Sequence, residues 1–459
     1  MEEMQQMIAE LSLTGDAFEK RYGRRKRLAT LTLGCKVNQY ETQALIERFQ
    51  QSGFDHVPSE QMADVVLINT CTVTSMSDRK SRQFIRRARK LNPNAIVAVA
   101  GCYAQLSPEE VSRIEGVQVI AGTTERHRLV DAVQYARHDQ KHPIVLVKPH
   151  EAGEIFEPLT VQETNDMTRA YVKIQDGCNQ YCSYCIIPYA RGPVRSRPSE
   201  AVINEIQKLV ANGYQEVVLT GIHLASYGKE QGESEALIRL LTSIDQMTGL
   251  KRLRLGSLEP TLITADFTEK LMMLQSVCHH FHLSLQSGSN QVLRGMNRRY
   301  NTLQYRKAVE LIRQYDPEAA ITTDIIVGFP GETEAHFQET LDFVSDIQFS
   351  DIHVFRYSPR EGTPAAAYPQ QVEEPVKHER SQRLSHLAAS MKEVYLKQLI
   401  SREVMVLMEK PSAERPDMME GHTSYYVRVV APLDEALFQR IVRVKIHRTG
   451  TDSCEGNVV

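Results

Sequence analysis

Apolar runs of strand length alternate with helix-like segments along most of this chain, and such alternation is typical of α/β proteins with parallel sheets. In the first part of the chain, apolar runs are separated by helical patterns. The runs are residues 28–33, 65–68, 96–100 and 117–121, and the clearest helical patterns are 41–51 and 78–91. We therefore predict a doubly wound parallel sheet over residues 26–140.

A second series of strand and helix patterns follows. Its strand-like runs are residues 171–175, 216–220, 252–256, 281–285, 321–327 and 352–357. Such a series fits a partial (βα)6 barrel of the TIM type, which carries its reactive groups at the carboxyl ends of the strands. We assign residues 164–394 to this barrel.

The two ends of the chain have different patterns. A long helical stretch at 376–400 is followed by short β-rich runs separated by Pro, Gly and Asp, which predict a small β-barrel over residues 396–459. These runs are residues 403–408, 425–430 and 440–447. Residues 1–25 are expected to form a flexible leader.

Composition limits the possible classes of protein. Of the 459 residues, 42% are hydrophobic and the net charge is −3, so the chain can build folded cores but is not a polycation. Nucleic-acid binding must then come from local basic patches. The first residues are acidic and polar, and no apolar run reaches the roughly 20 residues of a membrane span. We expect a cytoplasmic protein without a membrane partner, whose 8 cysteines are thiols or metal ligands rather than disulfides.

Three cysteines occupy equivalent positions in the predicted N-terminal sheet. Cys35, Cys71 and Cys102 each lie just beyond the carboxyl end of a different strand, and these ends share one edge of a parallel sheet. A single free cysteine is most often a small buried hydrophobe, but three at the same edge favour a common metal site. Three thiolates are one fewer than the four that usually hold an iron–sulfur cluster, which leaves one iron open.

A second cysteine triad follows the first predicted barrel strand. Cys178, Cys182 and Cys185 form the pattern C-x3-C-x2-C. Zinc sites usually show paired C-x2-C halves that supply four ligands, and no second pair follows here. Three thiolates in one tight loop favour a [4Fe–4S] cluster with one exchangeable iron.

Several segments around these cysteines resemble those of the radical S-adenosylmethionine methylthiotransferases, which modify tRNA and a ribosomal protein. The resemblance extends over nearly the whole chain. The matching segments are Asp176-Gly177-Cys178, Cys185-Ile186-Ile187-Pro188, Leu219-Thr220-Gly221, residues 285–289, residues 324–332 and Tyr357-Ser358-Pro359. The three N-terminal cysteines match the ligands of the auxiliary cluster of this family.

Two segments resemble the branch of this family that acts on N6-threonylcarbamoyladenosine at tRNA position 37. They are Leu-Gly-Cys-Lys-Val-Asn-Gln-Tyr-Glu at 33–41 and Ser-Leu-Glu-Pro at 257–260. After the first cysteine, the isopentenyl-adenosine branch typically has Gln-Met-Asn and the ribosomal-protein branch Pro-Lys-Asn. The resemblance implies sulfur insertion and methylation at C2 of that adenosine. The alternatives are a methylthiotransferase for another tRNA adenosine or for a ribosomal-protein side chain, and, in a different class, a non-enzymatic, metal-stabilised RNA-binding protein.

The family resemblance implies two [4Fe–4S] clusters with different tasks. Cys178, Cys182 and Cys185 would hold the cluster that binds S-adenosylmethionine and generates a 5′-deoxyadenosyl radical from it. The N-terminal triad would hold the cluster that carries the sulfur, and a second S-adenosylmethionine would donate the methyl group. The implied partners are the anticodon loop of tRNA, a reducing electron donor and a sulfur source.

Residues near the ends of the barrel strands are candidates for the S-adenosylmethionine pocket. They are Tyr184, Thr220, Gly221, Gln286, Ser287 and Asp324. By resemblance, Thr220 and Gly221 would hold the methionine amino group, Gln286 and Ser287 would contact the ribose, and Tyr184 would pack on the adenine. Asp324 would face the pocket. The alternative roles are turn geometry for the glycine and capping or barrel-core contacts for the polar side chains.

Basic residues crowd the helical pattern that follows Cys71. No acidic residue occurs between positions 79 and 90, although solvated helix faces usually mix charges. With Phe84, Ala88 and Leu91 facing the core, a stripe of arginines would point outward to RNA phosphates. The stripe consists of Arg79, Arg82, Arg86 and Arg89.

Other basic residues are also predicted to contact RNA. Arg191 and Arg195 follow the barrel triad. Arg443 and Lys445 alternate with apolar residues in the C-terminal module, which resembles the RNA-binding TRAM domain.

Two remaining cysteine positions are predicted to have no function. Residues 278–282, Cys-His-His-Phe-His, look like a metal site by composition. They begin a barrel strand, however, and we expect them on the face opposite the clusters. Cys454 has no partner pattern and is expected to be an ordinary thiol.

Overall fold

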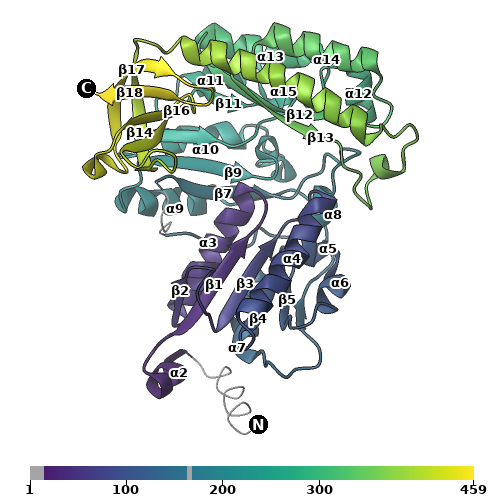
Figure 1. Ribbon diagram of the computed structural model, residues 1–459, viewed down its shortest axis with the longest axis vertical. Helices are drawn as coiled ribbons and strands as arrows, with labels where there is room; N and C mark the ends of the chain where they lie inside the picture. Colours follow the sequence, from purple (N-terminus) through teal and green to yellow (C-terminus); the bar gives the residue numbers. More distant parts are fainter. Residues whose placement is uncertain (1–14, 163–167) are drawn as a thin grey trace.

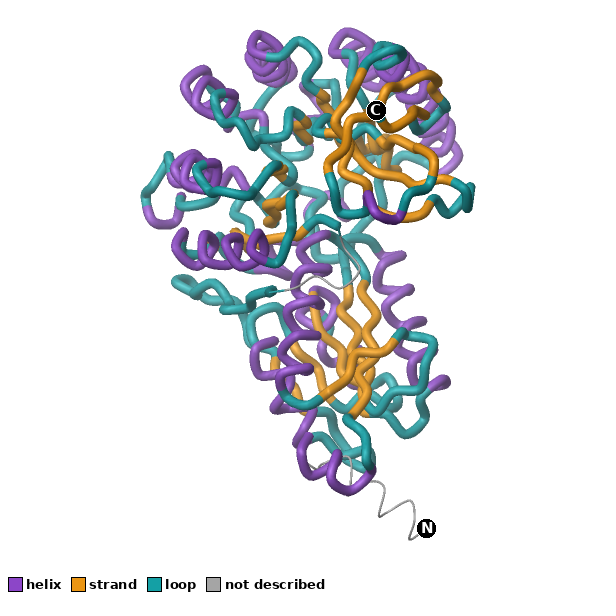
Figure 2. Tube along the Cα trace, turned by 90° about the vertical axis from the view of Figure 1, so that its left-hand side faces the viewer, coloured by secondary structure: helices purple, strands orange, loops and turns teal. Residues whose placement is uncertain are grey.

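The computed structural model describes residues 15–162 and 168–459. Figure 1 shows an α/β domain in purple and blue, a larger barrel domain in teal and green, and a small β-domain in yellow against the barrel. The perpendicular view of Figure 2 separates the same parts, with the N-terminal sheet seen below the barrel. The predicted α/β class and its three architectures are confirmed.

The N-terminal sheet is parallel, with the strand order β2-β1-β3-β4-β5-β6. The strands are β1 Lys26–Thr32, β2 Phe54–Val57, β3 Val65–Thr70, β4 Ile96–Gly101, β5 Val119–Ala121 and β6 Ile144–Leu146. β3 and β4 are buried at every position, which is why their sequences are continuous apolar runs rather than alternating ones. The short edge strands β2 and β6 were not predicted, and β6 extends the sheet beyond residue 140.

Helices cover both faces of this sheet, as in a doubly wound fold. Apolar residues of α3 and α7 pack on one face, and those of α4, α5 and α6 pack on the other. The helices are α3 Lys36–Gln51, α4 Ser75–Leu91, α5 Cys102–Leu106, α6 Pro108–Ser112 and α7 Leu129–Tyr135. Because α3 begins at Lys36 rather than at 41, Cys35 becomes its N-cap residue.

The central domain is the predicted partial barrel of parallel strands. Its strands are β7 Ala170–Asp176, β9 Glu216–Gly221, β10 Arg252–Leu255, β11 His280–His282, β12 Ala320–Val327 and β13 Asp351–Arg356. They form the sheets β10-β9-β7-β8 and β11-β12-β13, joined by bridges such as Leu253 to Val277, and β8 is the short antiparallel segment Arg195–Ser196. In the described part of the chain β7 does not pair with β13, so the barrel is open at that side.

Helices surround the outside of the barrel. They are α9 Ser199–Ala211, α10 Ala236–Asp245, α11 Ala265–Met272, α12 Asn290–Gly295, α13 Thr302–Tyr315, α14 Glu334–Ile347 and α15 Glu374–Lys397, whereas the short helix α8 Ile187–Arg191 lies against α5 of the N-terminal domain. One large apolar cluster joins the barrel strands to these helices. Within residues 15–162 and 168–459, no helix combines the length and apolarity needed to cross a bilayer.

The C-terminal module is a closed barrel with the strand order β14-β15-β16-β18-β17. The strands are β14 Glu403–Pro411, β15 Met418–Thr423, β16 Arg428–Pro432, β17 Ile441–Thr449 and β18 Cys454–Val458. The sequence patterns did not reveal β15 and β18, which are rich in Gly, Glu and Asn. Cys454 begins β18 and is fully buried in the barrel core.

Two parts of the predicted organisation lie wholly or partly outside the described residues. Of the expected leader, residues 1–14 are not described, whereas Gly15–Tyr22 forms helix α2 with Phe18 buried. The predicted first residue of the barrel domain, 164, also falls outside the described residues.

Candidate functional site

A cavity of about 1140 Å³ lies where the three domains meet. Its walls include Cys35 from the N-terminal domain, all three cysteines of the barrel triad, and Tyr426 from the C-terminal barrel. The carboxyl ends of the barrel strands and of the N-terminal sheet both face it, as expected for parallel α/β folds. Cys35 and the three cysteines of the barrel triad, far apart in sequence, therefore line one space, whereas Cys71 and Cys102 are buried beside it.

The barrel triad is held by the loop after β7. The backbone N–H of Cys178 donates to the carbonyl of Gly192 at 3.0 Å, and that of Cys185 donates to Cys182 at 2.9 Å. The guanidinium of Arg298 donates through Nη1 to Cys182 Sγ at 3.1 Å, while its Nη2 donates to Glu259 Oε1 at 3.1 Å. Glu259 thus fixes the arginine that faces a ligand sulfur.

The auxiliary triad follows three neighbouring strands, as predicted. Cys35 follows β1, Cys71 follows β3, and Cys102 follows β4 as the first residue of α5. Gly101, with φ +98°, makes the turn into Cys102, and an added Cβ would approach Asn69 Oδ1 to 2.5 Å. Only glycine fits this turn without displacing a residue at the sheet edge.

Asn38 and Arg191 connect the auxiliary triad to its surroundings. The side-chain amide of Asn38 donates to the carbonyls of Leu33 at 2.7 Å and Thr70 at 3.0 Å, which ties β1 to β3 beside the cysteines. Arg191, which belongs to the barrel domain, donates through Nη2 to Asn38 Oδ1 at 2.6 Å and through Nε to Cys102 Sγ at 3.2 Å. Each triad therefore has one cysteine sulfur that accepts a hydrogen bond from a buried arginine.

The thiol pKa values favour neutral groups in the absence of a cation. Burial raises the pKa of Cys178 and Cys102 to about 11 and that of Cys185 to about 12, and it also raises the pKa of Cys71. A bound metal deprotonates such thiols by its own charge. The two arginine donors would then face thiolate sulfurs, with which they bond more strongly.

The spacing of the sulfurs fits a cluster better than a single ion. Zinc–sulfur bonds of about 2.3 Å in a tetrahedron bring ligand sulfurs within about 3.8 Å of one another. Among the described residues, neither cysteine triad has all its sulfurs within 4.8 Å of each other. Each triad offers three thiols whose sulfur atoms are spread more widely than a zinc ion requires. Such a set suits a [4Fe–4S] cluster with one open iron.

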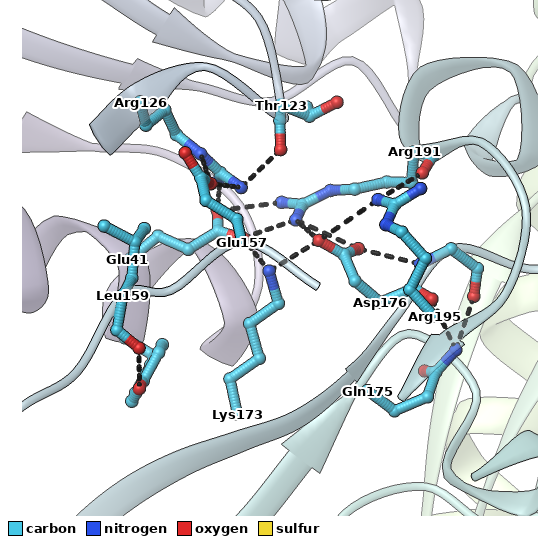
Figure 3. Close-up of polar contacts among 12 residues, drawn as sticks. Glu41, Thr123, Arg126, Glu157, Leu159, Lys173, Gln175, Asp176, Arg191 and Arg195 are labelled. Carbon is cyan, nitrogen blue, oxygen red and sulfur yellow. Dashed lines mark hydrogen bonds and ion pairs between the residues drawn. The ribbon is translucent and has the colours of Figure 1, made fainter. Parts of the chain in front are cut away.

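A buried cluster of charged side chains joins the N-terminal domain to the barrel. Glu41 lies at its centre, within 2.7 Å of Lys173 Nζ and in contact with Arg126 and Arg191. Its members, most of them visible in Figure 3, are the cations Arg126, Lys173, Arg191 and Arg195 and the carboxylates Glu41, Glu154, Glu157 and Asp176. The charges balance, which is the condition under which buried ions are tolerated.

The carboxyls of this cluster are ionised. Burial opposes the ionisation of Glu41 and Asp176, but the surrounding cations outweigh it and lower both pKa values, that of Glu41 to about 2. The prediction that Arg191 and Arg195 contact RNA is wrong, because their side chains are only 0% and 3% exposed within this cluster. The sequence around them gives no indication of the acids that approach from the other domain.

Most of the predicted pocket residues line the cavity. Tyr184, Thr220, Gly221, Gln286 and Asp324 all form part of its wall. Gln286 has a φ of +70°, a conformation that costs energy in a residue other than glycine and is often found at functional sites.

The prediction for Ser287 is wrong. Its side chain is fully buried, outside the cavity wall, and its hydroxyl lies 3.3 Å from that of Thr340 on α14. Ser287 lies beyond the end of β11, and its contact with Thr340 places its side chain against α14.

Asp324 belongs to a group that was not predicted. Its carboxylate lies 3.2 Å from His282 Nε2 and 3.1 Å from His353 Nδ1. Burial opposes ionisation of this carboxyl, but the hydrogen bonds from the two imidazoles lower its pKa. All three residues line the cavity.

The expectation that residues 278–282 lie away from the clusters is wrong for two of them. His280 and His282 line the cavity that the cysteines share. Alternate residues of a strand face the same side, so both histidines point inward while Phe281 joins the outer core.

The basic helix α4 differs from its predicted arrangement. Its buried face is formed by Asp78, Ser81, Ile85 and Ala88, whereas Leu91 is 45% exposed. Arg82 binds Glu110 at 2.9 Å and Arg89 lies 4.0 Å from Glu115, so half of the proposed stripe faces acids of the protein itself.

The other basic residues of α4 and of β17 remain open to solvent. On α4 these are Arg79, Lys80, Arg86, Arg87 and Lys90, and among described residues none of them has an ion-pair partner. Arg443 and Lys445 on β17 are also exposed, with Arg443 3.5 Å from Glu403.

Family models match the two cysteine-bearing domains. Residues 27–122 match the model described as uncharacterized protein family UPF0004, and residues 172–344 match the radical SAM superfamily. A threonylcarbamoyladenosine tRNA methylthiotransferase, MtaB of Bacillus subtilis (strain 168), is 42% identical over 93% of this chain and 95% of its own length. This chain belongs to the radical SAM methylthiotransferase family.

Other relatives within this family carry two different names. A threonylcarbamoyladenosine tRNA methylthiotransferase of Aquifex aeolicus (strain VF5) is 37% identical over 83% of this chain and 92% of its own. A tRNA-2-methylthio-N(6)-dimethylallyladenosine synthase of Moorella thermoacetica (strain ATCC 39073 / JCM 9320) is 35% identical over 95% of this chain and 99% of its own. Membership of this enzyme family gives the non-enzymatic alternative no support.

Among solved structures, the radical S-adenosylmethionine methyltransferase TsrM of Kitasatospora setae shares the fold. It matches with a TM-score of 0.56 and 16% identity over 74% of this chain and 77% of that chain. At this identity the likeness concerns the fold alone. The family implies a [4Fe–4S] cluster and S-adenosylmethionine as cofactors.

Proposed function

We propose that this protein inserts sulfur and adds a methyl group at C2 of N6-threonylcarbamoyladenosine at position 37 of tRNA. The observation that carries the proposal is 42% identity, over nearly all of both chains, to an enzyme of that name. The cavity supports it, because Cys35 of the N-terminal triad and all three cysteines of the barrel triad line the same space. The reaction would take place in the cytoplasm, where the tRNA is found.

The cysteines have separate tasks in this proposal. Cys178, Cys182 and Cys185 hold one [4Fe–4S] cluster, and Cys35, Cys71 and Cys102 hold a second. When bound, these clusters and two molecules of S-adenosylmethionine supply a 5′-deoxyadenosyl radical, the sulfur and the methyl group. An electron donor and a sulfur source must restore the enzyme, since the adenosine C2–H bond is replaced by a C–S–CH3 unit.

The other cavity residues bind and orient. Thr220 and Gly221, at the end of β9, offer backbone groups to the methionine part of S-adenosylmethionine, and Tyr184 and Gln286 face the same space. Tyr184 also packs against a small apolar cluster. This cluster keeps water away from the reacting groups, which protects a radical from side reactions.

The polar character of the inner cavity favours the threonylcarbamoyl substrate over a dimethylallyl one. Beyond the barrel triad, the wall includes His280, His282, Asp324, His353 and Arg428. A purely apolar prenyl substituent would remove water from these polar groups without offering them a hydrogen bond, which is costly. A substituent with carboxylate, hydroxyl and amide groups can offer such bonds.

Mass spectrometry of tRNA nucleosides tests this function. After anaerobic reconstitution, the enzyme with S-adenosylmethionine and a reductant should convert tRNA that carries N6-threonylcarbamoyladenosine to its 2-methylthio form. Iron should reach about 8 per chain, and about 4 when Cys35, Cys71 and Cys102 are all changed to alanine. Conversion of dimethylallyladenosine tRNA or of a ribosomal protein instead would contradict the assigned substrate.

A further inference from the structure

The proposed substrate, on whose identity this inference rests, places a negative charge close to the reacting carbon. The threonylcarbamoyl group is attached at N6 of adenine and ends in a carboxylate. N6 is bonded to C6, and C6 and C2 are the two neighbours of N1 in the same ring. When C2 faces the auxiliary triad, the carboxylate must therefore lie within a few bond lengths of that triad.

The cavity wall contains few cations that could receive this carboxylate. Its lysine and arginine residues are Lys36, Arg254, Arg298, Lys392 and Arg428. Four of them already bind carboxylates of the protein: Arg254 binds Glu216, Arg298 binds Glu259, Lys392 binds Asp351 and Asp452, and Arg428 binds Glu420. Among the described residues, Lys36 alone of the five has no ion-pair or hydrogen-bond partner.

Lys36 also has the right position. It directly follows Cys35 at the start of α3, so its side chain leaves the backbone beside a ligand of the auxiliary cluster. The ammonium lies 6.0 Å from the centre of the Tyr171 ring and 5.8 Å from that of Tyr426, which are cation–π distances. The side chain is exposed, and the surface that it faces is the cavity.

The electrostatic environment leaves Lys36 without a counter-ion. Glu216 exerts a weak electrostatic attraction on it, but this carboxylate is paired with the guanidinium groups of Arg252 and Arg254. A substrate carboxylate would supply the missing charge.

We propose that Lys36 binds the carboxylate of the threonylcarbamoyl group and so determines which modified adenosine the enzyme accepts. The rings of Tyr171 and Tyr426 hold the ammonium at the cavity wall. A substituent without a carboxylate leaves the cation unpaired, and a dimethylallyl group would place methyl groups against it. Discrimination by loss of a charge pair is stronger than discrimination by shape.

The test compares two tRNAs that differ only at position 37, one with N6-threonylcarbamoyladenosine and one with unmodified adenosine. Equilibrium binding to the reconstituted wild-type enzyme should be tighter for the modified tRNA by about 10- to 100-fold. Lys36→Gln should lose most of this preference by weakening only the modified tRNA. Its iron and sulfide content and the spectra of its clusters should match those of the wild type.

Two further variants control for a structural role. Lys36→Arg keeps the cation and should keep most of the preference. Lys392→Gln removes a cavity cation that is already paired with Asp351 and Asp452, and it should leave the preference unchanged. Loss of the preference in both Lys36 variants together with loss of iron would overturn the proposal in favour of a structural role.

The outcomes separate this proposal from the proposed function. Suppose that the wild type converts the threonylcarbamoyl tRNA and that Lys36→Gln still prefers the modified tRNA. Lys36 then does not bind the carboxylate, and the proposed function is unaffected. If the wild type fails to convert that tRNA, both the proposed function and the proposed role of Lys36 are overturned.

Discussion

At the scale of single residues, two arginines stand in the same relation to the two triads. Arg298 donates to Cys182 Sγ and is fixed by Glu259, and Arg191 donates to Cys102 Sγ and is fixed by Glu41. Hydrogen bonds to ligand sulfurs tune the reduction potential of iron–sulfur clusters. Neither arginine was expected in this role: Arg191 was assigned to RNA, and Arg298 carried no signal in the sequence.

We expect Arg298→Lys to lower the reduction potential of the barrel cluster by about 30–60 mV. Lysine keeps the positive charge but lacks the guanidinium group that donates to both Glu259 and the Cys182 sulfur. Loss of the hydrogen bond to this sulfur destabilises the reduced cluster, which is the more negative state. The measurement is a redox titration followed by electron paramagnetic resonance, with the auxiliary triad changed to alanine.

Arg191→Lys provides the matched comparison. It should lower the potential of the auxiliary cluster, measured with the barrel triad changed to alanine, and leave the barrel cluster unaffected. Equal shifts of both clusters in either variant would show a general structural disturbance instead of a local hydrogen bond.

At the scale of elements, the basic residues of α4 fall into two groups: some bind acidic side chains of the protein, and the others are exposed to solvent. The helix begins directly after the Cys71 loop, and its first turn touches the barrel through an ion pair of Asp78 with Arg360 at 2.6 Å. Val73, just before it, lines the cavity. The exposed arginines therefore extend outward from the cavity, a course that fits the backbone of a tRNA whose nucleotide 37 has entered it.

Arg86→Gln should weaken tRNA binding roughly threefold to tenfold at physiological salt, because one phosphate contact is lost. The slope of the logarithm of affinity against the logarithm of salt concentration should fall by about 1. The measurement is a salt series of equilibrium binding with a tRNA substrate.

Arg82→Gln, on the same helix, is the control for this prediction. Arg82 faces Glu110 and the Tyr103 hydroxyl rather than solvent, so its loss should leave both the affinity and the salt slope nearly unchanged. Equal effects of the two substitutions would contradict the assignment of Arg86 to a phosphate.

At the scale of the whole molecule, the buried charge cluster around Glu41 fixes the N-terminal domain on the barrel. It joins α3, β7 and the segment between the domains, and it contains the arginine that reaches Cys102. The distance between the two cysteine triads is therefore set by the same ion pairs that hold the domains together.

Glu41→Gln should lower the unfolding free energy by about 3–5 kcal/mol at pH 7, because it leaves buried cations without an anion. The carboxyl pKa is lowered to about 2 in the folded protein, against about 4.3 unfolded, so its contribution is full above pH 4.3 and disappears as the pH falls toward 2. The difference between wild type and variant should shrink over that range.

Urea unfolding followed by circular dichroism at several pH values measures this difference. Glu110→Gln, which removes a half-exposed partner of Arg82, is the control and should cost less than about 1 kcal/mol. A Glu41→Gln protein as stable as the wild type at pH 7 would show that the domains are held together by other contacts.

The fold class, the cysteine triads and the family could all be predicted from the amino-acid sequence. These follow from local patterns: apolar periodicity, the position of each cysteine directly after a strand, and the C-x3-C-x2-C spacing. Parallel strands bring their carboxyl ends together in any such fold, so the convergence of Cys35, Cys71 and Cys102 could be inferred before their neighbours were known.

Which charged residues are free to act depends on contacts between segments far apart in the chain. Arg191 and Arg195 have the same local pattern as surface RNA contacts, yet they are buried against Glu41 of the N-terminal domain and Glu154 of the segment between the domains. His280 and His282 line the cavity because a strand places alternate residues inward, and the register of that strand was not visible in the sequence. Lys36 stands out only after each neighbouring cation is matched with its acid, and such long-range pairs leave no pattern along the chain.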